Sequence, residues 1–239
     1  MNAIEIYPGV LHIEESYRVY CSFVSGKTYS ILWDTGLGRA DLRSYVEKQS
    51  LLPYTVLISH GHPDHTGGIC AFEKVYLAKA DWAMIGNRPS ANVFELKTEQ
   101  VYDIGDVTAQ IVALPGHTPG SCGLLLHSRC LLLAGDALNP RLQLLGDEAC
   151  PLETLRDTLE TALALPFDRY LTSHAPTLLS KKQLEVHLKH LDHFNPNVLT
   201  EIRCAGGTMW SSVCKQDGLR SGFIIGESLL QRIQNGNQS

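Results

Sequence analysis

The sequence predicts a mixed α/β protein in which short apolar strands alternate with amphipathic helices. Apolar runs and period-two alternation mark the strands, and leucines three or four residues apart mark the helices. The 239 residues are 44% apolar and 19% charged, which is ordinary for a globular protein and excludes a disordered chain. No linker or internal repeat separates a second domain, so residues 1–239 are expected to form a single domain.

The first half of the chain is predicted to consist mainly of strands joined by turns. Residues 4–34 alternate in polarity and are broken by turn residues, which indicates several consecutive strands. A helix is predicted over 39–49, because its leucine, tyrosine and valine lie on one side. Further elements are predicted in this order: strand 55–59, strand 74–78 and loop 86–92.

The second half continues the alternation until the pattern is lost near the C-terminus. Apolar runs predict strands at residues 107–114, 122–126, 131–134 and 169–172. Leucine spacing predicts a helix at 152–165 and another at 180–194, the latter opened by a capping box of Ser180 and Gln183. Residues 205–222 carry four glycines and little periodicity, and are expected to form an irregular tail.

Charge and cysteine content limit the classes of partner and the cellular compartment that can be expected. The formal net charge is −5 and no basic block occurs, so neither nucleic acid nor an anionic membrane is expected as a partner. The seven cysteines include no CxxC pair, and the first residues lack a signal-like apolar core. No run approaches the ~18 apolar residues that cross a bilayer. A cytoplasmic protein acting on a small molecule is therefore expected.

Histidine is unusually concentrated in three loops that follow predicted strands. The densest of them reads His60-Gly61-His62-Pro63-Asp64-His65, and it places four metal-binding side chains within six residues. Residues two apart point the same way in an extended loop, so His60 and His62 can share a metal ion. Pro63 redirects the chain and lets Asp64 and His65 point elsewhere. This loop predicts a metal site.

Three further candidate ligands follow other predicted strands. His117 lies in the segment LPGHTPG, Asp136 in LAGDA and His174 in LTSHAP. Each is unspecific alone, because a loop histidine is usually only solvated. Together with the first loop they make five histidines and two aspartates at strand ends, where side chains distant in sequence can converge.

The order of these motifs resembles the metallo-β-lactamase-fold hydrolases, whose hallmark is HxHxDH followed by His, Asp and His. The match runs from residue 4 to about 176, and the flanking PGHTPG and AGD sequences resemble the glyoxalase II branch. The resemblance implies an α/β fold of four layers, an αββα sandwich with two sheets face to face and helices outside.

The resemblance also implies a role for each ligand. The implied sets are His60, His62 and His117 for a first metal, Asp64, His65 and His174 for a second, and Asp136 as the bridge between them. Asp34, in the segment DTG, matches a family position that supports the ligand loops without usually touching metal. Asp64 is also expected to act in catalysis by orienting the attacking hydroxide.

Seven ligands are too many for one tetrahedral zinc ion, which favours two divalent metal ions. Zinc is expected first, with iron or manganese as alternatives. Two such ions can hold a bridging hydroxide as nucleophile at neutral pH. We therefore expect a metal-dependent hydrolase of a small ester, thioester or lactone. The alternatives are a mononuclear iron sulfur dioxygenase or a phosphodiesterase of the same fold, and a non-catalytic metal-bound sensor.

Substrate selection is expected to lie outside the ligand loops. Residues 138–151 are predicted to form a loop over the site, in which Arg141 would meet an anionic group. The tail after it brings Trp210, and residues 177–239 are expected to form a C-terminal extension that helps to close the pocket. The histidines at 187, 190 and 193 are interpreted as surface residues, because they face away from the leucine stripe of their helix.

Overall fold

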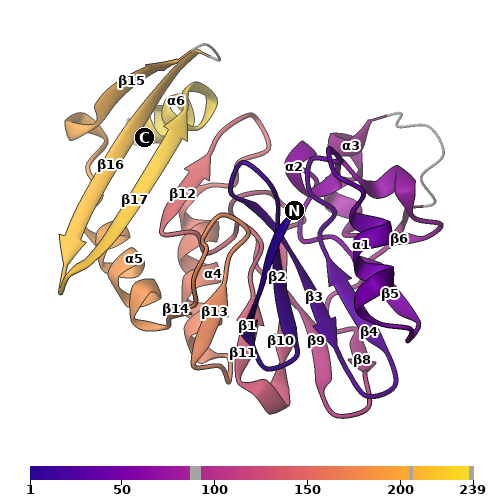
Figure 1. Ribbon diagram of the computed structural model, residues 1–239. Helices are drawn as coiled ribbons and strands as arrows, with labels where there is room; N and C mark the ends of the chain where they lie inside the picture. The colour runs from indigo at the N-terminus through magenta and orange to yellow at the C-terminus, as the bar shows by residue number, and fades with distance from the viewer. Residues whose placement is uncertain (87–92, 205–206, 237–239) are drawn as a thin grey trace.

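The computed structural model describes residues 1–86, 93–204 and 207–236, and these form three β-sheets with helices around them (Figure 1). The first sheet has seven strands in the order β1-β2-β3-β4-β5-β6-β7. Its strands are β1 (Asn2–Tyr7), β2 (Val10–Ser16), β3 (Val19–Ser25), β4 (Ser30–Trp33), β5 (Tyr54–Leu57), β6 (Val75–Leu77) and β7 (Val93–Glu95). The strands predicted within 4–34, at 55–59 and at 74–78 are confirmed. All but the first residue of the predicted loop 86–92 lies outside the described residues.

The second sheet has six strands in the order β14-β13-β11-β10-β9-β8. Its strands are β8 (Val101–Asp103), β9 (Thr108–Ala113), β10 (Cys122–Leu126), β11 (Leu131–Leu133), β13 (Arg169–Leu171) and β14 (Leu179–Ser180). Strands β11 and β13 run parallel, so both end on the same edge of the sheet. Strands β4 and β5 of the first sheet are parallel in the same way.

The two sheets pack face to face, and helices cover their outer faces. Ile31 and Trp33 of β4 belong to a buried cluster with Leu124 and Leu133 of the second sheet. Leu32 lies between them in sequence and points outward, into a cluster that includes residues of α1. Because side chains alternate along a strand, a four-residue apolar strand fills two cores at once.

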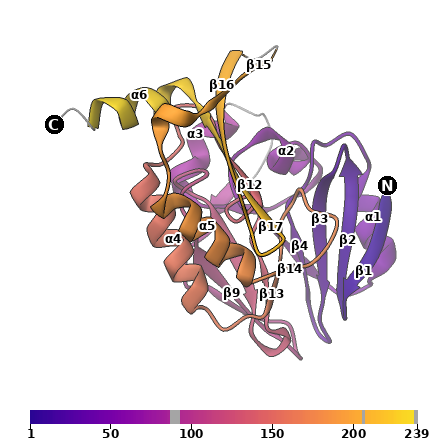
Figure 2. The ribbon, with the colours of Figure 1, turned by 90° about the vertical axis from the view of Figure 1, so that its left-hand side faces the viewer.

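The helices complete four layers. They are α1 (Leu42–Gln49), α2 (Pro63–Thr66), α3 (Trp82–Ile85), α4 (Leu152–Ala164), α5 (Lys182–Asp192) and α6 (Glu227–Gly236). Leu155 and Leu159 of α4 pack in one cluster with Leu125 and Leu132 on the outer face of the second sheet. Figure 2 shows α4 and α5 on one side of the molecule and β1–β3 on the other. The αββα sandwich is confirmed.

A third sheet was not predicted. It has the strand order β12-β17-β16-β15, and its strands are β12 (Arg141–Leu144), β15 (Thr200–Cys204), β16 (Gly207–Gln216) and β17 (Leu219–Gly226). The interpretations of 138–151 as a plain loop and of 205–222 as an irregular tail are therefore wrong. One face of this sheet packs on the helices through Leu142, Leu144, Phe223 and Ile225. Strands β15, β16 and β17 are joined as consecutive hairpins, but β12 comes from a distant segment, with Arg141 pairing with Gly222, so local periodicity does not predict the sheet.

The two long helices are confirmed, but the predicted capping box is wrong. Helix α5 begins at Lys182, its N-cap is Lys181, and no side chain caps it. Ser180 instead ends strand β14 and pairs with Arg169. By contrast, α1 begins after Asp41, whose side chain accepts a hydrogen bond from the Ser44 backbone amide at 3.0 Å.

Candidate metal centre

The predicted ligands lie where strands end, on loops that converge between the two main sheets. His60 follows β5, Asp136 follows β11 and His174 follows β13. His62 is the residue before the short helix α2, which carries Asp64 and His65. Parallel strands place their carboxyl ends at one edge, so residues more than a hundred positions apart meet there.

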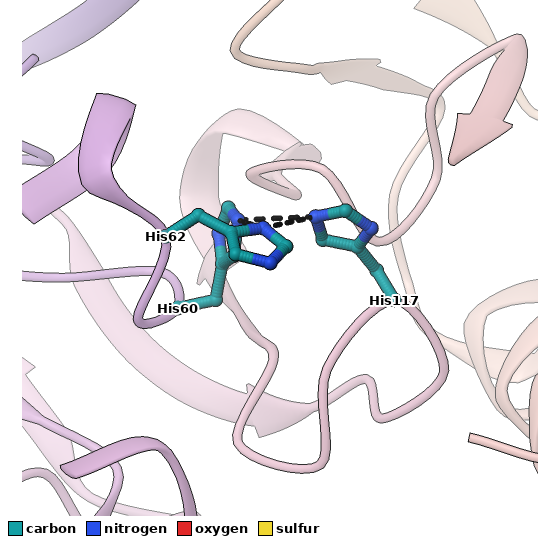
Figure 3. Close-up of side chains that lie close together, drawn as sticks. All are labelled: His60, His62 and His117. Atoms are coloured by element: carbon teal, nitrogen blue, oxygen red, sulfur yellow. Dashed lines mark hydrogen bonds between the residues drawn. The ribbon is translucent and has the colours of Figure 1, made fainter. Parts of the chain in front are cut away.

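Three histidines form a compact triangle of ring nitrogens (Figure 3). His62 Nδ1 lies 3.0 Å from His60 Nε2 and 2.8 Å from His117 Nε2, and the latter two atoms are 3.2 Å apart. Tetrahedral ligands at zinc–nitrogen distances of about 2.0–2.1 Å would lie about 3.3 Å apart. The triangle is therefore close to the size that one such ion requires.

A second group lies beside the triangle and contains both aspartates. His174 Nε2 lies 3.0 Å from Asp136 Oδ2 and 3.3 Å from Asp64 Oδ2. His65 Nε2 lies 3.6 Å from Asp64 Oδ1 and from Asp136 Oδ1. Asp136 also approaches His117 Nε2, at 3.8 Å, so this carboxylate lies between the two groups.

In each of these histidines one ring nitrogen points into the site, and the other, here called the remote nitrogen, contacts a hydrogen-bond acceptor. For His60, His62 and His117 the acceptors are Ser59 Oγ at 3.0 Å, Glu148 Oε1 at 3.1 Å and the Gln143 carbonyl. For His65 and His174 they are Asp34 Oδ2 at 2.9 Å and the Arg18 carbonyl at 3.2 Å. A neutral imidazole that donates from one nitrogen presents a lone pair on the other. In this neutral tautomer all five rings would present a lone pair to the same interior.

Two buried polar atoms at the centre show that this donor set fits a metal ion. His65 Nε2 and Asp136 Oδ1 are buried, and neither has a hydrogen-bond partner among the described residues. Six other buried side-chain atoms in the described residues also lack partners, but these two lie among the candidate ligands. Leaving a buried polar atom unpaired costs about 1–3 kcal/mol. A divalent cation would satisfy both atoms.

The ionisation of the site follows from burial and from the two aspartates. Burial, reinforced by the neighbouring histidines, holds the pKa of His60 well below its usual range, which keeps the ring neutral. Burial disfavours the Asp64 carboxylate, but its contacts with His174 and His65 outweigh this and lower its pKa to about 2. Burial disfavours the charged His174 ring, but its contacts with Asp136 and Asp64 outweigh this and raise its pKa to about 10, so a metal ion would displace a proton from this ring. Neutral imidazoles and ionised carboxylates are the forms that bind metals.

Asp34 ties the ligand loops together. It follows β4 with a left-handed φ of +66° and is buried. Its carboxylate accepts hydrogen bonds from the Ser59 amide at 2.7 Å, the Ser59 hydroxyl at 2.9 Å and the Ser173 hydroxyl at 3.1 Å, in addition to that from His65. One side chain therefore fixes the residue before His60, the residue before His174 and the ring of His65.

Two carboxylates that support the site were not predicted from the sequence. Buried Asp81 accepts hydrogen bonds from the amides of Gly61 and Gly120 and from the Thr118 hydroxyl, which fastens two ligand loops to each other. It follows the predicted strand at 74–78, so its strand-end position was the available signal. Glu148 lies 86 residues from His62, and no local pattern connects them.

The two predicted substrate residues lie on opposite faces of the third sheet. Arg141 is exposed and pairs in register with Gly222. Trp210 pairs with Ile225, a core residue, and packs against the cluster around α4 and α5. The structure therefore does not bring Trp210 together with Arg141.

The interpretation of the α5 histidines as surface residues is wrong for two of the three. His187 is fully buried and His190 is 5% exposed, because this helix lies against β17 as well as α4. Both Nδ1 atoms contact the Ser221 hydroxyl, at 2.7 and 2.8 Å. His193 is exposed, as predicted.

The fold and the converging ligands define an αββα protein with a histidine–aspartate metal site. The comparison with known families agrees: the model of the metallo-beta-lactamase superfamily matches residues 17–174. The chain therefore belongs to the metallo-beta-lactamase superfamily, whose fold holds divalent metal ions, and the resemblance noted in the sequence is confirmed.

Curated relatives are distant and carry the names of hydrolases. A hydroxyacylglutathione hydrolase of Rhodopseudomonas palustris is 29% identical over 100 residues, which cover 41% of this chain and 39% of that protein. The human acyl-coenzyme A thioesterase MBLAC2 is 26% identical over 191 residues, covering 58% of this chain and 68% of that protein. The chain thus matches about two fifths of the length of the first relative.

Solved structures support the fold. A metallo-beta-lactamase from Pontibacter korlensis superposes with a TM-score of 0.65 at 18% identity, over 81% of this chain and 99% of that one. A metallo-beta-lactamase family protein from Thermus thermophilus gives 0.64 at 20% identity, over 78% and 80%. In the described parts of the chain no helix combines the length and apolar character needed to cross a bilayer.

Proposed function

We propose that this protein is a dinuclear metal-dependent hydrolase of a small ester, thioester or lactone. The observation that carries the proposal is the inward orientation of five imidazoles around two carboxylates, with each remote ring nitrogen held by an acceptor. Histidines that were buried only for packing would not need to turn five ring nitrogens towards one interior.

The overlapping ligand groups support two ions. Three groups of side chains have ligand atoms within 4.8 Å of one another: His60, His62 and His117; His60, His65 and Asp136; and Asp64, His65 and His174. We propose that the first and last groups each hold one divalent ion, most simply zinc, and that Asp136 bridges them. When bound, such ions supply a nucleophilic hydroxide at neutral pH and polarise the scissile carbonyl.

The protein's own residues would position and shield this chemistry. Asp64 stays ionised and its side chain is 30% exposed, so its carboxylate can accept a hydrogen bond from the attacking hydroxide and fix its direction. Asp136 and His65 are buried and exclude water from the inner side. Asp34 and Asp81 keep the loops in register, so little reorganisation is needed during the reaction.

A thioester is the favoured substrate within this class. One relative is named an acyl-coenzyme A thioesterase and another a hydroxyacylglutathione hydrolase, and these names support a thioester here. We further propose that residues 177–239 help to close the site. Strand β17 of this segment pairs with β12, whose Gln143 carbonyl holds His117.

Metal analysis and turnover together test the proposal. We expect about two divalent ions per purified chain and hydrolysis of at least one of three neutral probes: an S-acyl-N-acetylcysteamine thioester, a p-nitrophenyl ester and a γ-lactone. Removal of metal by a chelator should abolish turnover, and added zinc should restore it. One iron ion per chain with oxygen consumption would support a dioxygenase instead, and full metal without turnover would support a sensor.

A further inference from the structure

The outer face of the third sheet carries three cations that the metal site does not use. Side chains of paired residues lie on the same face, so Arg141 lies with Gly222, and Arg220 lies with Lys215. The opposite face is the one that packs on the helices through Leu142 and its neighbours. All three cationic side chains are exposed.

These cations have no acidic partner in the described part of the chain. The ion pairs found there involve other residues, and the nearest acidic residue of the hairpin, Asp217, pairs with Lys182 at 3.7 Å. Three like charges on one face repel one another unless an anion lies among them. An arginine pair without a carboxylate is therefore a candidate for binding an oxyanion from outside.

A small pocket lies among these side chains. It has a volume of about 200 Å³ and is lined by Arg141 and Arg220, with Pro140, Ser211, Val213 and Gly222 around them. A Cβ added at Gly222 would lie 3.4 Å from Arg141 Cγ, so the Arg141 stem passes over this glycine towards the other strands. The pocket thus combines two guanidinium groups and one hydroxyl, which are donors suited to a carboxylate or phosphate.

The sheet holds this pocket in a fixed relation to the metal centre. The backbone carbonyl of Arg220 accepts a hydrogen bond from buried Gln183 of α5, at 3.0 Å. At the other end, the Gln143 carbonyl holds His117. Gln143 and Arg141 are two residues apart on one strand, so their Cα atoms lie roughly 7 Å apart along the same face.

We propose that Arg141 and Arg220 form a subsite for an oxyanion on the substrate's leaving group, with Lys215 adding to its field. The inference rests on the proposed hydrolase function for its context, but the subsite can be tested without turnover. The substrate it fits has its reacting carbonyl at the metal centre and a carboxylate or phosphate in the distant part of its leaving group. A thiol carrier with an anionic tail has this form.

The test compares anionic and neutral thioesters of the same acyl group. We expect the Arg141→Gln/Arg220→Gln double variant to lose at least tenfold in kcat/KM, mainly through KM, on an acyl-coenzyme A or an acylglutathione. Hydrolysis of the S-acyl-N-acetylcysteamine, which has no anion, should change less than twofold. The phosphate-bearing and carboxylate-bearing arms show which oxyanion the subsite prefers. Arg203→Gln, on exposed strand β15, is the matched control and should change neither.

Direct binding separates this inference from the proposed function. S-methyl-coenzyme A and S-methylglutathione cannot be hydrolysed. In calorimetry, the preferred carrier of the two should bind the double variant at least tenfold more weakly than it binds wild type. If wild type turns over no thioester but still binds a carrier through the arginines, the hydrolase proposal fails and the subsite stands. If neither carrier's binding nor the anionic-to-neutral ratio of kcat/KM depends on the arginines, the subsite is wrong.

Discussion

Two groups of histidines are buried or half-buried in the protein, and their ring nitrogens find partners in different ways. The metal-site group comprises His60, His62, His65, His117 and His174 with Asp64 and Asp136. The helix group comprises His187 and His190 with the hydroxyls of Ser221 and Ser212. In the first group ring nitrogens face one another. In the second, the Ser221 hydroxyl lies between the Nδ1 atoms of the two rings, and His187 Nε2 is buried without a hydrogen-bond partner among the described residues.

The difference lies in what fills the space between the nitrogens. A serine hydroxyl donates one hydrogen and accepts others, so Ser221 can serve two imidazoles without any ion. No such group lies within the triangle of His60, His62 and His117, where nitrogen directly faces nitrogen. Burial of histidine therefore does not identify a metal site by itself, whereas inward lone pairs beside carboxylates do.

The largest expected effect comes from removing the carboxylate that lies between the two ligand groups. Asp136→Asn should lower hydrolysis by at least about 1,000-fold and reduce bound metal below two ions per chain, because it removes the buried negative charge. His62→Ala, at a partly exposed position, should do the same by opening the triangle. Elemental analysis and turnover of a thioester measure both effects. Asp168→Asn, at an exposed position, is the control, and full metal with full activity in either site variant would refute the dinuclear assignment.

The helix group should respond to acid instead of to metal. Burial, together with His190, lowers the pKa of His187 to about 4, below its usual 6.5. The folded state therefore disfavours the protonated ring. The stability that the neutral His187 ring contributes is fully present above about pH 6.5 and is lost as the pH falls towards 4. A shift of this size corresponds to about 3 kcal/mol.

Replacing His187 tests this acid response. We expect His187→Gln to lower the free energy of unfolding by roughly 2–3 kcal/mol at pH 7.5, and the gap from wild type to narrow by pH 4.5. Urea unfolding of the metal-free proteins across this range measures the gap. His193→Gln, at the exposed end of the same helix, should show no gap. A gap that stays constant with pH would mean that folding does not shift the pKa of His187.

The sequence reveals the metal-site group more readily than its surroundings, for physical reasons. Four of its residues lie in one loop, and the others follow predicted strands, so the ligand types and strand-end positions are local features. Asp34 could be placed only through the family resemblance. Glu148 and Asp81 act across the fold, and the contacts that give them a role exist only after the loops converge.

The C-terminal segment shows why the remaining elements could not be predicted. Helix α5 packs on two elements, with leucines toward the main core and His187 and His190 toward β17. A single leucine stripe therefore underestimates the buried face. Strand β16 mixes polar and apolar residues on both faces, for example Ser211 with Val213 on one and Trp210 with Ser212 on the other, so no period-two pattern emerges.

A smaller effect is expected when a supporting contact of the metal-site group is removed. Glu148 accepts from His62 Nε2, and Gly146, with a φ of +76°, leaves the space that the carboxylate occupies. Glu148→Leu should weaken metal affinity by roughly 10-fold, and Glu148→Gln by less, because an amide oxygen can still accept the hydrogen bond. Competition with a chelator measures the affinity. Glu153→Gln, at an exposed position on α4, is the control, and equal losses in the Leu and Gln variants would show that charge alone matters.

The smallest expected effects separate two neighbouring serines on opposite faces of β16. Ser212 lies 2.8 Å from His190 Nε2, so Ser212→Ala should lower the free energy of unfolding by about 1 kcal/mol and leave carrier binding unchanged. Ser211 lines the pocket between the two arginines, so Ser211→Ala should weaken binding of the anionic carrier by a few-fold without loss of stability. Urea unfolding and calorimetry on both variants measure the two effects. Because the substitution is the same at adjacent positions, each variant is the control for the other. If Ser211→Ala left carrier binding unchanged, Ser211 would have no role in the subsite, and a loss of stability in Ser211→Ala would show that this serine also supports the fold.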